Sequence, residues 1–446
     1  MNSVTFLTQT LGCRANQAET KKIETDLISL GHQPAKEKQT PNTIILNTCV
    51  ITQKGENESA RAIRQLKKQY PDSFFIVTGC AVNLWLNISK KKPLPPADLF
   101  VTNEKKSTIP EIITNRLPFS CQIPDLSRPN RASLLLDPGS NKRTFVKIQD
   151  GCNHFCSYCI VPYLRKRPSS KSPKQIIKEI NQACQTGTQE AILCGINLSL
   201  YGKDLVPTTS LAYLIKEILK KTNLPRLSLS SLTPELIDQE FVDIFIADQK
   251  KDQRLSSYWH LALQSGSESV LKRMNRRTNL KKLAQSLQYT KEALPYFTLR
   301  ADIIVGFPDE TEEEFNQTLE FINNNDIAFG HLFPYSPRPQ TQAQKKIVGG
   351  IWKTISDKVK KNRKRRLSFA LQKNRQTGGK KIMNSQRLVL VLKKTPYGWW
   401  GLSDNYWPTK IKTSKDENKK YLGKIIPVKI SALEDKTLRG NLVDAD

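Results

Sequence analysis

The first hundred residues alternate between short apolar runs and longer segments whose apolar residues recur at helical spacing. The helical segments span roughly Gln17–Leu30 and Glu56–Gln69, and the apolar runs are typical of buried strands. A strand–helix alternation with a period of about thirty residues predicts βαβ units on a parallel sheet. The predicted strands are Val4–Thr8, Ile44–Thr48, Phe74–Gly79 and Ala97–Val101.

The alternation resumes near residue 143 and predicts six further strands, with helices between them and after them. Six such units predict an open (β/α)6 barrel, whose active site is expected on the loops that follow the strands. The predicted strands are Thr144–Ile148, Glu190–Cys194, Arg226–Ser230, Trp259–Gln264, Leu299–Val305 and Ala328–Phe333. The predicted helices are Pro173–Gln185, Ser210–Lys221, Pro234–Ala247, Ser267–Met274, Leu280–Ala293 and Thr311–Asn324.

Beyond the barrel the pattern changes twice. Residues 353–381 are strongly basic with apolar residues near helical spacing, which predicts a basic helix suited to binding phosphates. From Arg387 onward the pattern alternates as in β-strands and predicts a small β-barrel of oligonucleotide-binding character. Its aromatic residues would either stack on bases or form the core; they are Trp399, Trp400, Tyr406 and Trp407.

These patterns together predict an α/β protein built from successive domains. An N-terminal open parallel α/β sheet domain covers residues 1–117, and a Pro-rich linker covers 118–142. The partial (β/α)6 barrel covers 143–350, the basic helix 351–381 and the small β-barrel 382–446.

The chain is strongly basic: 70 Lys and Arg against 41 Asp and Glu give a formal net charge of +29. A positive field of this size attracts polyanions, nucleic acid first, although a solvated lysine coat is the alternative. The sequence starts without a signal-peptide pattern, and no apolar stretch approaches the ~20 residues of a membrane span. We therefore expect a cytoplasmic protein without membrane contact.

Nine cysteines in a chain without an export signal indicate reduced thiols, metal ligands or core residues rather than disulfides. Cys184 and Cys194 fall in a predicted helix and a predicted strand, so we expect them in the core. Cys121 lies in the predicted linker and is expected to be unpaired and incidental.

Three cysteines at C-x3-C-x2-C spacing follow the first predicted barrel strand. Cys152, Cys156 and Cys159 are spaced as in loops that bind a 4Fe–4S cluster and leave its fourth iron open to a chelating cosubstrate. The alternative is a zinc loop whose fourth ligand lies elsewhere, with His154 the nearest candidate.

Three more cysteines each follow a predicted strand of the N-terminal domain. Because the carboxyl ends of parallel strands share one edge of a sheet, we expect Cys13, Cys49 and Cys80 to converge there. Three converging thiolates again suit an iron–sulfur cluster with one open iron. The alternative is three unrelated buried cysteines, which are common in protein cores.

Polar stretches also follow the later barrel strands, where they would suit a ribose, an amino acid head group and an adenine edge. Ordinary turn chemistry is the alternative, because Gly, Asn and Ser are also turn formers. The candidates are Asn197, Ser230, Gln264 and the segment Ile304–Gly306.

Taken together, these residues resemble the radical S-adenosylmethionine (SAM) methylthiotransferase family over nearly the whole chain. The cysteine loop, with Tyr158 just before Cys159, matches the radical SAM motif, and the C-terminal end is similar to a TRAM domain. The three N-terminal motifs are Thr10–Asn16, Asn47–Thr52 and Val77–Cys80. The stretches Asn197–Gly202 and His331–Pro339 are most similar to members that act on N6-threonylcarbamoyladenosine of tRNA.

The resemblance implies two 4Fe–4S clusters, with SAM as both radical source and methyl donor. The reaction would be methylthiolation of C2 of N6-threonylcarbamoyladenosine at position 37, in the anticodon stem-loop of tRNA. The implied cluster ligands are Cys152, Cys156 and Cys159 for one cluster and Cys13, Cys49 and Cys80 for the other. The implied SAM-pocket residues are Tyr158, Asn197, Ser230, Gln264, Ile304 and Gly306, and no catalytic residue beyond the cluster ligands is expected.

A monomer and a reductant such as flavodoxin or ferredoxin are further expectations. Three alternatives stay open: methylthiolation of isopentenyladenosine-37 of tRNA, methylthiolation of a ribosomal protein aspartate, and a non-catalytic RNA-binding zinc protein. The net charge and the basic helix favour a nucleic acid over a protein loop as the target.

Overall fold

The computed structural model describes residues 3–37, 39–90, 93–115, 142–165, 167–396, 398–412 and 421–443. Cys121 and the predicted linker, apart from its last residue, lie outside these ranges. The chain forms two compact units. The first comprises residues 1–136, 150–168 and 336–345, and the second comprises 137–149, 169–335 and 346–446. The loop that carries Cys152, Cys156 and Cys159 therefore belongs with the N-terminal domain.

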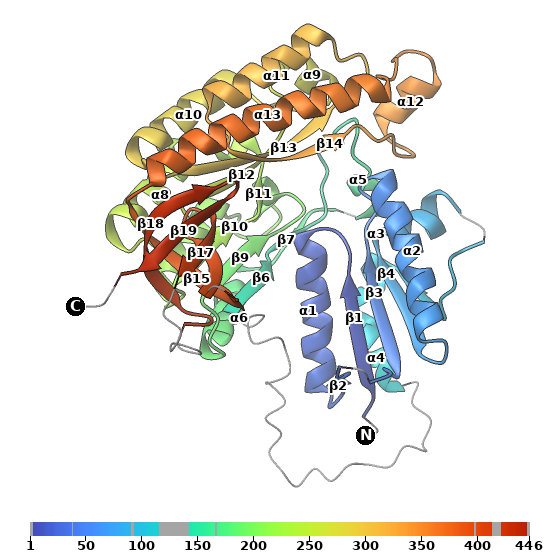
Figure 1. Cartoon of the computed structure of the whole chain (residues 1–446). Helices are drawn as coiled ribbons and strands as arrows, with labels where there is room; N and C mark the ends of the chain where they lie inside the picture. The colour runs from blue at the N-terminus through green and yellow to red at the C-terminus, as the bar shows by residue number, and fades with distance from the viewer. Residues whose placement is uncertain are drawn as a thin grey trace. The chain divides into compact units, whose positions relative to one another are not determined.

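The first unit contains a five-stranded parallel sheet of order β2-β1-β3-β4-β5, drawn in blue in Figure 1. Its strands are β1 (Thr5–Thr10), β2 (Gln33–Pro34), β3 (Thr43–Thr48), β4 (Phe74–Gly79) and β5 (Leu99–Val101). Its helices are α1 (Arg14–Ser29), α2 (Gln53–Gln69), α3 (Cys80–Asn83) and α4 (Ile109–Asn115), with a π turn at Leu84–Ile88 and a 3-10 turn at Asn103–Thr108. The predicted parallel α/β sheet is confirmed. The two-residue strand β2 was not predicted because its residues carry no apolar signal.

Both faces of this sheet are buried, which explains its nearly continuous apolar strands. On one face, Ile44 and Phe75 pack into a core that includes residues of α2 and α3. On the other, Ile45 and Ile76 pack against residues of α1 and α4.

The second unit contains the partial barrel as two parallel sheets, β6-β9-β10 and β11-β12-β13-β14. The third predicted strand, Arg226–Ser230, corresponds to β10, the edge strand of the first sheet. After Ser230 a short strand that was not predicted, β11, is the edge strand of the second sheet. The strands are β6 (Arg143–Lys147), β9 (Glu190–Cys194), β10 (Arg226–Leu229), β11 (Ser231–Leu232), β12 (Tyr258–Gln264), β13 (Thr298–Val305) and β14 (Phe329–Pro334). The intervening helices are α6 (Pro173–Gln185), α7 (Leu211–Lys221), α8 (Gln239–Lys251), α9 (Glu268–Arg273), α10 (Leu280–Ala293) and α11 (Glu312–Asn324).

The helix predicted from Pro234 begins later than expected. A 3-10 turn spans Pro234–Leu236, and the side chain of Asp238 then caps α8 by accepting from the backbone N–H of Phe241 at 2.9 Å. Smaller elements are β7 (Gln149–Asp150), α5 (Val161–Leu164), β8 (Ser169–Ser170), a 3-10 turn at Leu198–Leu200 and α12 (Gln342–Val348).

The basic segment forms one long helix, α13 (Asp357–Ile382), which packs along α11 and β14 (Figure 1). Some of its basic side chains form ion pairs within the protein and are not available to bind a phosphate. Arg363 is buried and its NH1 donates to Oε2 of Glu310 at 2.7 Å, while Arg366 pairs with Glu312. The expectation that the whole basic run binds phosphates is therefore wrong for these two arginines.

A closed five-stranded barrel of order β15-β16-β17-β19-β18 ends the chain, as predicted, in red in Figure 1. Its strands are β15 (Gln386–Thr395), β16 (Gly398–Ser403), β17 (Pro408–Lys412), β18 (Ile425–Glu434) and β19 (Thr437–Leu442). Trp399, Tyr406 and Trp407 are buried, so they belong to the core rather than to a stacking surface. Trp400 is half-buried, with the Lys393 ammonium 5.1 Å from its ring centroid.

Two glycines of the first unit differ in the space around their Cα atoms. Gly79 has a φ of +103°, and an added Cβ would lie 2.5 Å from the backbone N and O of Thr48. Gly31 has a φ of +88°, but nothing lies within 4 Å of an added Cβ. We expect Gly31→Ala to destabilise the first unit by about 1–2 kcal/mol, from the positive φ alone. Gly79→Ala should cost roughly 2 kcal/mol more, because the methyl group overlaps β3.

Hydrogen–deuterium exchange of peptides that cover β3 and β4 measures both changes. Equal loss of protection in the two variants would show that the approach of Gly79 to Thr48 imposes no steric constraint.

Candidate functional site

The three N-terminal cysteines meet at one edge of the first sheet. Cys13 is the N-cap of α1 after β1, Cys49 follows β3, and Cys80 is the first residue of α3 after β4. The chain at Gly12 passes so close to Cys49 that an added Cβ would lie 2.7 Å from its Sγ. Since β1 and β3 are neighbours at the point where the strand order reverses, this edge is where doubly wound sheets bind ligands.

The protein environment disfavours the thiolate forms of Cys13 and Cys49. Burial raises the pKa of Cys13 and raises that of Cys49 to about 12. The neighbouring thiols of Cys80 and Cys13 raise the pKa of Cys49 further, because three like charges in one place repel. A cationic group bound beside them would favour the thiolate forms of Cys13 and Cys49.

The donor set of Cys13, Cys49 and Cys80 suits either of two inorganic groups. Three thiolates can ligate an iron–sulfur cluster and leave one iron open, or supply three of the four ligands of a zinc ion.

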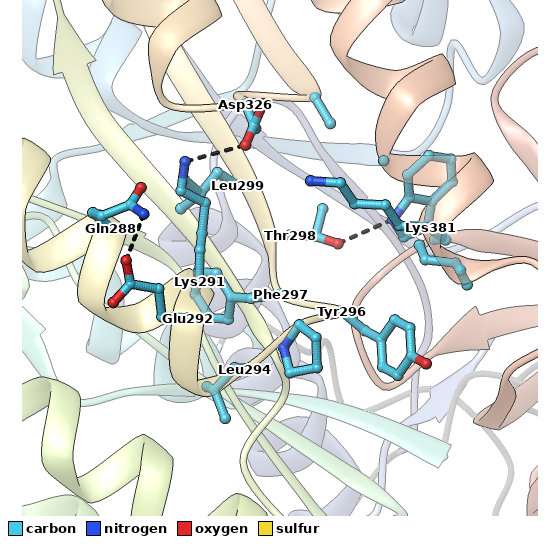
Figure 2. A pocket seen from close by; sticks show the side chains of 15 residues that line it. Gln288, Lys291, Glu292, Leu294, Tyr296, Phe297, Thr298, Leu299, Asp326 and Lys381 are labelled. Carbon is cyan, nitrogen blue, oxygen red and sulfur yellow. Dashed lines mark hydrogen bonds and ion pairs between the residues drawn. The ribbon is translucent and has the colours of Figure 1, made fainter.

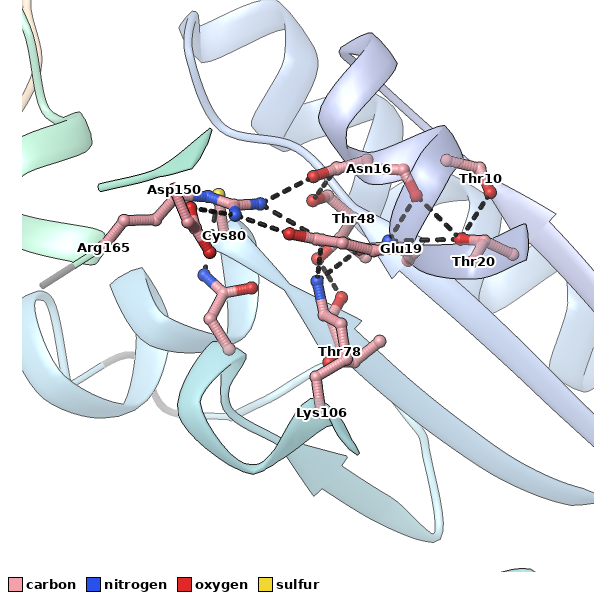
Figure 3. Close-up of polar contacts among 12 residues, drawn as sticks. Thr10, Asn16, Glu19, Thr20, Thr48, Thr78, Cys80, Lys106, Asp150 and Arg165 are labelled. Carbon is pink, nitrogen blue, oxygen red and sulfur yellow. Dashed lines mark hydrogen bonds and ion pairs between the residues drawn. The ribbon is translucent and has the colours of Figure 1, made fainter. Parts of the chain in front are cut away.

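A buried network of charges lies beside the triplet (Figure 3). Arg165 NH1 is 2.6 Å from Oε1 of Glu19 and 2.8 Å from Oδ1 of Asp150, and its NH2 donates to Asn16 at 2.9 Å. Lys106 Nζ lies 2.5 Å from Oε2 of Glu19. Burial opposes the charge of Arg165, but its neighbours, led by Cys80, Glu19 and Asp150, raise its pKa well above the usual value.

Arg165 also connects the two cysteine groups within the first unit. It follows Cys159 in the sequence by six residues, and Asp150 stands just before Gly151 and Cys152. The guanidinium thus pairs with a carboxylate at the start of the cysteine loop and with one on α1, the helix that Cys13 caps.

The cysteine loop itself is fixed by its backbone and by two apolar anchors. The backbone N–H of Cys159 donates to the carbonyl of Cys156 at 2.9 Å, and Phe155 has a φ of +45°. Ile160 and Leu164 are buried in the core that α2 and α3 share. The loop sulfurs and Tyr158 are partly exposed, so a bound group would be accessible to a cosubstrate. His154, the alternative zinc ligand, is exposed.

The predicted SAM-pocket residues divide between the units. Tyr158 lies in the first, and Asn197, Ser230, Gln264, Ile304 and Gly306 lie in the second, at the carboxyl ends of β9 to β13.

Local structure already explains two of these residues. Asn197 Oδ1 accepts from the backbone N–H of Ser199 at 3.1 Å, as expected for turn chemistry. An added Cβ at Gly306 would lie 2.5 Å from Cγ of Lys360, so α13 alone requires a glycine there.

Several polar residues, in both units, were not predicted as site residues from the sequence. Arg165 and Lys106 carry no motif of their own, and only the fold shows that they are buried. The inner-face residues of β12 to β14 are His260, Arg300, Asp302 and His331. The sequence does indicate that two of them share a face of β13, because Arg300 and Asp302 alternate with apolar residues there.

A cavity of about 260 Å³ in the second unit is not at the expected site (Figure 2). Thr298 and Leu299, which line it, begin β13, whereas chemistry is expected beyond the strand's carboxyl end. An ion pair of 3.1 Å between Lys291 and Asp326 borders it.

None of the helices in the described part of the chain has the length and hydrophobicity of a membrane span.

Comparison with known proteins gives matches along most of the chain. Residues 146–322 match the radical SAM superfamily, and residues 5–99 match uncharacterized protein family UPF0004. The chain is 30% identical to threonylcarbamoyladenosine tRNA methylthiotransferase MtaB of Aquifex aeolicus, over 95% of this chain and 99% of that protein. It is 31% identical to tRNA-2-methylthio-N(6)-dimethylallyladenosine synthase of Clostridium tetani, over 98% of this chain and 96% of that protein. The radical SAM methyltransferase TsrM of Kitasatospora setae shares the fold, with a TM-score of 0.53 at 13% identity over 78% of this chain and 76% of that chain.

Removing Arg165 should destabilise the first unit. Arg165→Met would remove a cationic partner of the buried Glu19, and we expect a loss of about 3–5 kcal/mol of stability in the metal-free protein. Lys22→Met on α1, the helix that carries Glu19, is the control. Its pair with Asp26 is exposed and should cost at most about 1 kcal/mol. Urea unfolding followed by hydrogen exchange of α1 measures both, and similar costs would contradict the network's role.

The raised pKa of Cys49 should appear in its reactivity. In the metal-free protein at pH 8, a thiol with a pKa of about 12 should react with iodoacetamide on the order of 10³ times more slowly than free cysteine. Because only the thiolate reacts, the rate should still be rising above pH 10. Peptide mass spectrometry measures it, with the urea-unfolded chain as control. A plateau near pH 9 in the folded protein would refute the raised pKa.

Proposed function

The chain belongs to the radical SAM tRNA methylthiotransferases, and from this premise we propose that it methylthiolates C2 of N6-threonylcarbamoyladenosine at position 37 of tRNA. The observation that carries the proposal is the gathering of Cys13, Cys49 and Cys80 at one sheet edge, in the same unit as the Cys152–Cys159 loop. A radical SAM enzyme needs only the loop for radical formation. A second thiol triplet provides a separate place for the sulfur to be transferred.

We assign each cluster to one triplet. Cys152, Cys156 and Cys159 would hold the cluster that binds SAM, and Cys13, Cys49 and Cys80 would hold the second. When bound, these groups supply the radical that removes hydrogen from C2 and the sulfur and methyl group that replace it. The protein's residues position them: Arg165 and Lys106 place buried positive charge beside the second triplet, which offsets the negative charge of thiolates.

The remaining proposals concern cosubstrate and tRNA. Tyr158, Asn197, Ser230, Gln264, Ile304 and Gly306 would bind SAM at the strand ends. The net charge of +29 and the exposed basic residues of α13 would attract the phosphates of the anticodon stem-loop.

Dimethylallyladenosine-37 is the second candidate substrate, because the Clostridium tetani relative named for it is as similar as the relative named for threonylcarbamoyladenosine. Both relatives are named as tRNA enzymes, which favours tRNA over a ribosomal protein. The family assignment replaces the non-catalytic zinc-protein hypothesis.

Nucleoside analysis of tRNA from a strain that lacks the gene tests the substrate. We expect methylthio-threonylcarbamoyladenosine to disappear and the unthiolated nucleoside to accumulate, while methylthio-dimethylallyladenosine is unchanged. The measurement is liquid chromatography with mass spectrometry of digested tRNA. Unchanged methylthio-threonylcarbamoyladenosine would refute the assignment.

Cysteine variants of the purified enzyme test the two-site mechanism. Cys80→Ala should abolish methylthio product but leave reductive SAM cleavage, whereas Cys156→Ala should abolish both. Cys184→Ala, in α6 of the second unit and a member of neither triplet, should leave both activities intact. Methylthio product from Cys80→Ala would show that the second site is not required.

A further inference from the structure

Four polar side chains share one face of the barrel sheet. The register pairs His260 of β12 with Arg300 of β13, and Asp302 of β13 with His331 of β14. Register partners in a parallel sheet lie on the same face, as do residues two apart in one strand. All four side chains therefore project from one face, and none of them belongs to the proposed SAM pocket.

That face is turned away from the covering helices. On the opposite face of β12, the Trp259 ring lies 5.5 Å from the ring of Phe241 in α8. On the opposite face of β14, an added Cβ at Gly330 would meet Leu371 of α13 at 2.8 Å. The polar side chains therefore face the interior of the barrel, on the same side of β13 as Ile304.

Hydrogen bonds fix the proton positions in this cluster. Nε2 of His260 and Nδ1 of His331 lie 2.8 and 2.9 Å from the same Oδ1 of Asp302. Burial opposes the charge of Asp302, but the hydrogen bonds from the two histidines hold its pKa well below its usual range. A carboxylate only accepts, so both histidines donate to it through these atoms. In neutral His331 the remaining Nε2 is then an acceptor, 3.2 Å from NH1 of Arg300.

Arg300 is left without a negative partner. Among the described residues it forms no ion pair, and its buried Nε has no hydrogen-bond partner. Its other contact is the ring of Phe329, whose centroid lies 5.5 Å from the guanidinium. The hydrogen bond of NH1 with His331 is exposed, so the guanidinium is accessible to a ligand, and its planar fork matches a carboxylate in two parallel hydrogen bonds.

A metal ion at the same place fits less well. The ligand atoms of His260, Asp302 and His331 all lie within 4.8 Å of one another, which is a spacing that also suits a cation. Coordination through Nδ1 of His331 would put a proton on its Nε2. That proton would point at the NH1 donor of Arg300, 3.2 Å away, and the guanidinium would repel the ion. The group of His260, Arg300, Asp302 and His331 therefore suits an anion better than a metal ion.

We infer that Arg300, held in place by His331 and Asp302, binds the carboxylate of the threonylcarbamoyl group and so selects this substrate over dimethylallyladenosine. The inference rests on the proposed function and deepens it. A dimethylallyl group has no polar atom and would leave the guanidinium desolvated and unpaired. Arg300 lies about 13 Å along β13 from Ile304, so the substituent would extend inward from the strand ends.

The test uses the reconstituted full-length enzyme and three anticodon stem-loops that differ only at position 37. They carry threonylcarbamoyladenosine, its threonine amide, or dimethylallyladenosine. The wild-type enzyme should prefer the acid over the amide by roughly 10- to 100-fold in kcat/KM, because a charge-assisted pair is lost. Arg300→Gln should lose the same factor on the acid and show no preference between acid and amide, and Arg300→Lys should recover part of it.

Two controls separate this loss from damage to the protein. SAM cleavage without RNA should be unchanged in Arg300→Gln. Arg277→Gln, which removes the same charge at an exposed position of the second unit, should keep the preference for the acid.

Equal wild-type rates on acid and amide, or faster turnover of dimethylallyladenosine, would overturn the inference while leaving a methylthiotransferase. One equivalent of a non-iron metal that is lost in His260→Ala would also overturn it. No methylthio product from any of the stem-loops would overturn the proposed function, and the inference with it.

Discussion

The buried pairing of Arg165 with Glu19 and Asp150 is the interaction on which the site in the first unit depends. Parallel strands bring Cys13, Cys49 and Cys80 to one edge, but burial makes the thiols of Cys13 and Cys49 harder to ionise. A cluster with three thiolate ligands therefore needs compensating charge nearby. Arg165 and Lys106 provide it from inside the protein, where water screens it least, and Glu19 keeps both cations paired. Because Arg165 also ends the loop that starts at Asp150, the same ion pairs fix the position of the loop that carries Cys152, Cys156 and Cys159.

The barrel uses polar groups in a different way. Its outer strand faces are apolar and covered by helices, whereas the inner faces of β12 to β14 carry an ordered set of hydrogen-bonding groups. Asp302 orients both histidines, and His331 in turn orients Arg300. A cation presented in this way costs stability when it has no ligand, which is common where a protein must discriminate between substrates. The first unit thus carries the two cysteine triplets, and the second carries the polar side chains of β12 to β14.

Much of the fold and the position of the cysteines could be predicted from the sequence, because parallel strands with two buried faces are nearly continuous apolar runs. The boundaries of α6 and α10 were predicted to the residue, and the convergence of three cysteines followed from the strand-end rule. Two kinds of feature could not be predicted. Short or polar strands such as β2, β17 and β19 depend on their partners rather than on their own residues. Long-range charge pairing, such as that of Arg165 with Glu19 or Arg363 with Glu310, leaves no local pattern; indeed, Arg363 was wrongly assigned to phosphate binding with the rest of its basic run.

Iron, sulfide and zinc content after anaerobic reconstitution, read together with Mössbauer spectra, tests whether one chain holds two iron–sulfur clusters on its two cysteine triplets. We expect about eight irons per chain in the wild-type protein. We expect about four in the variant with Cys13, Cys49 and Cys80 replaced by Ala, and about four when Cys152, Cys156 and Cys159 are replaced instead. One or two zinc ions with little iron would show that the triplets do not hold two clusters, as would an iron content that the loss of Cys13, Cys49 and Cys80 does not change.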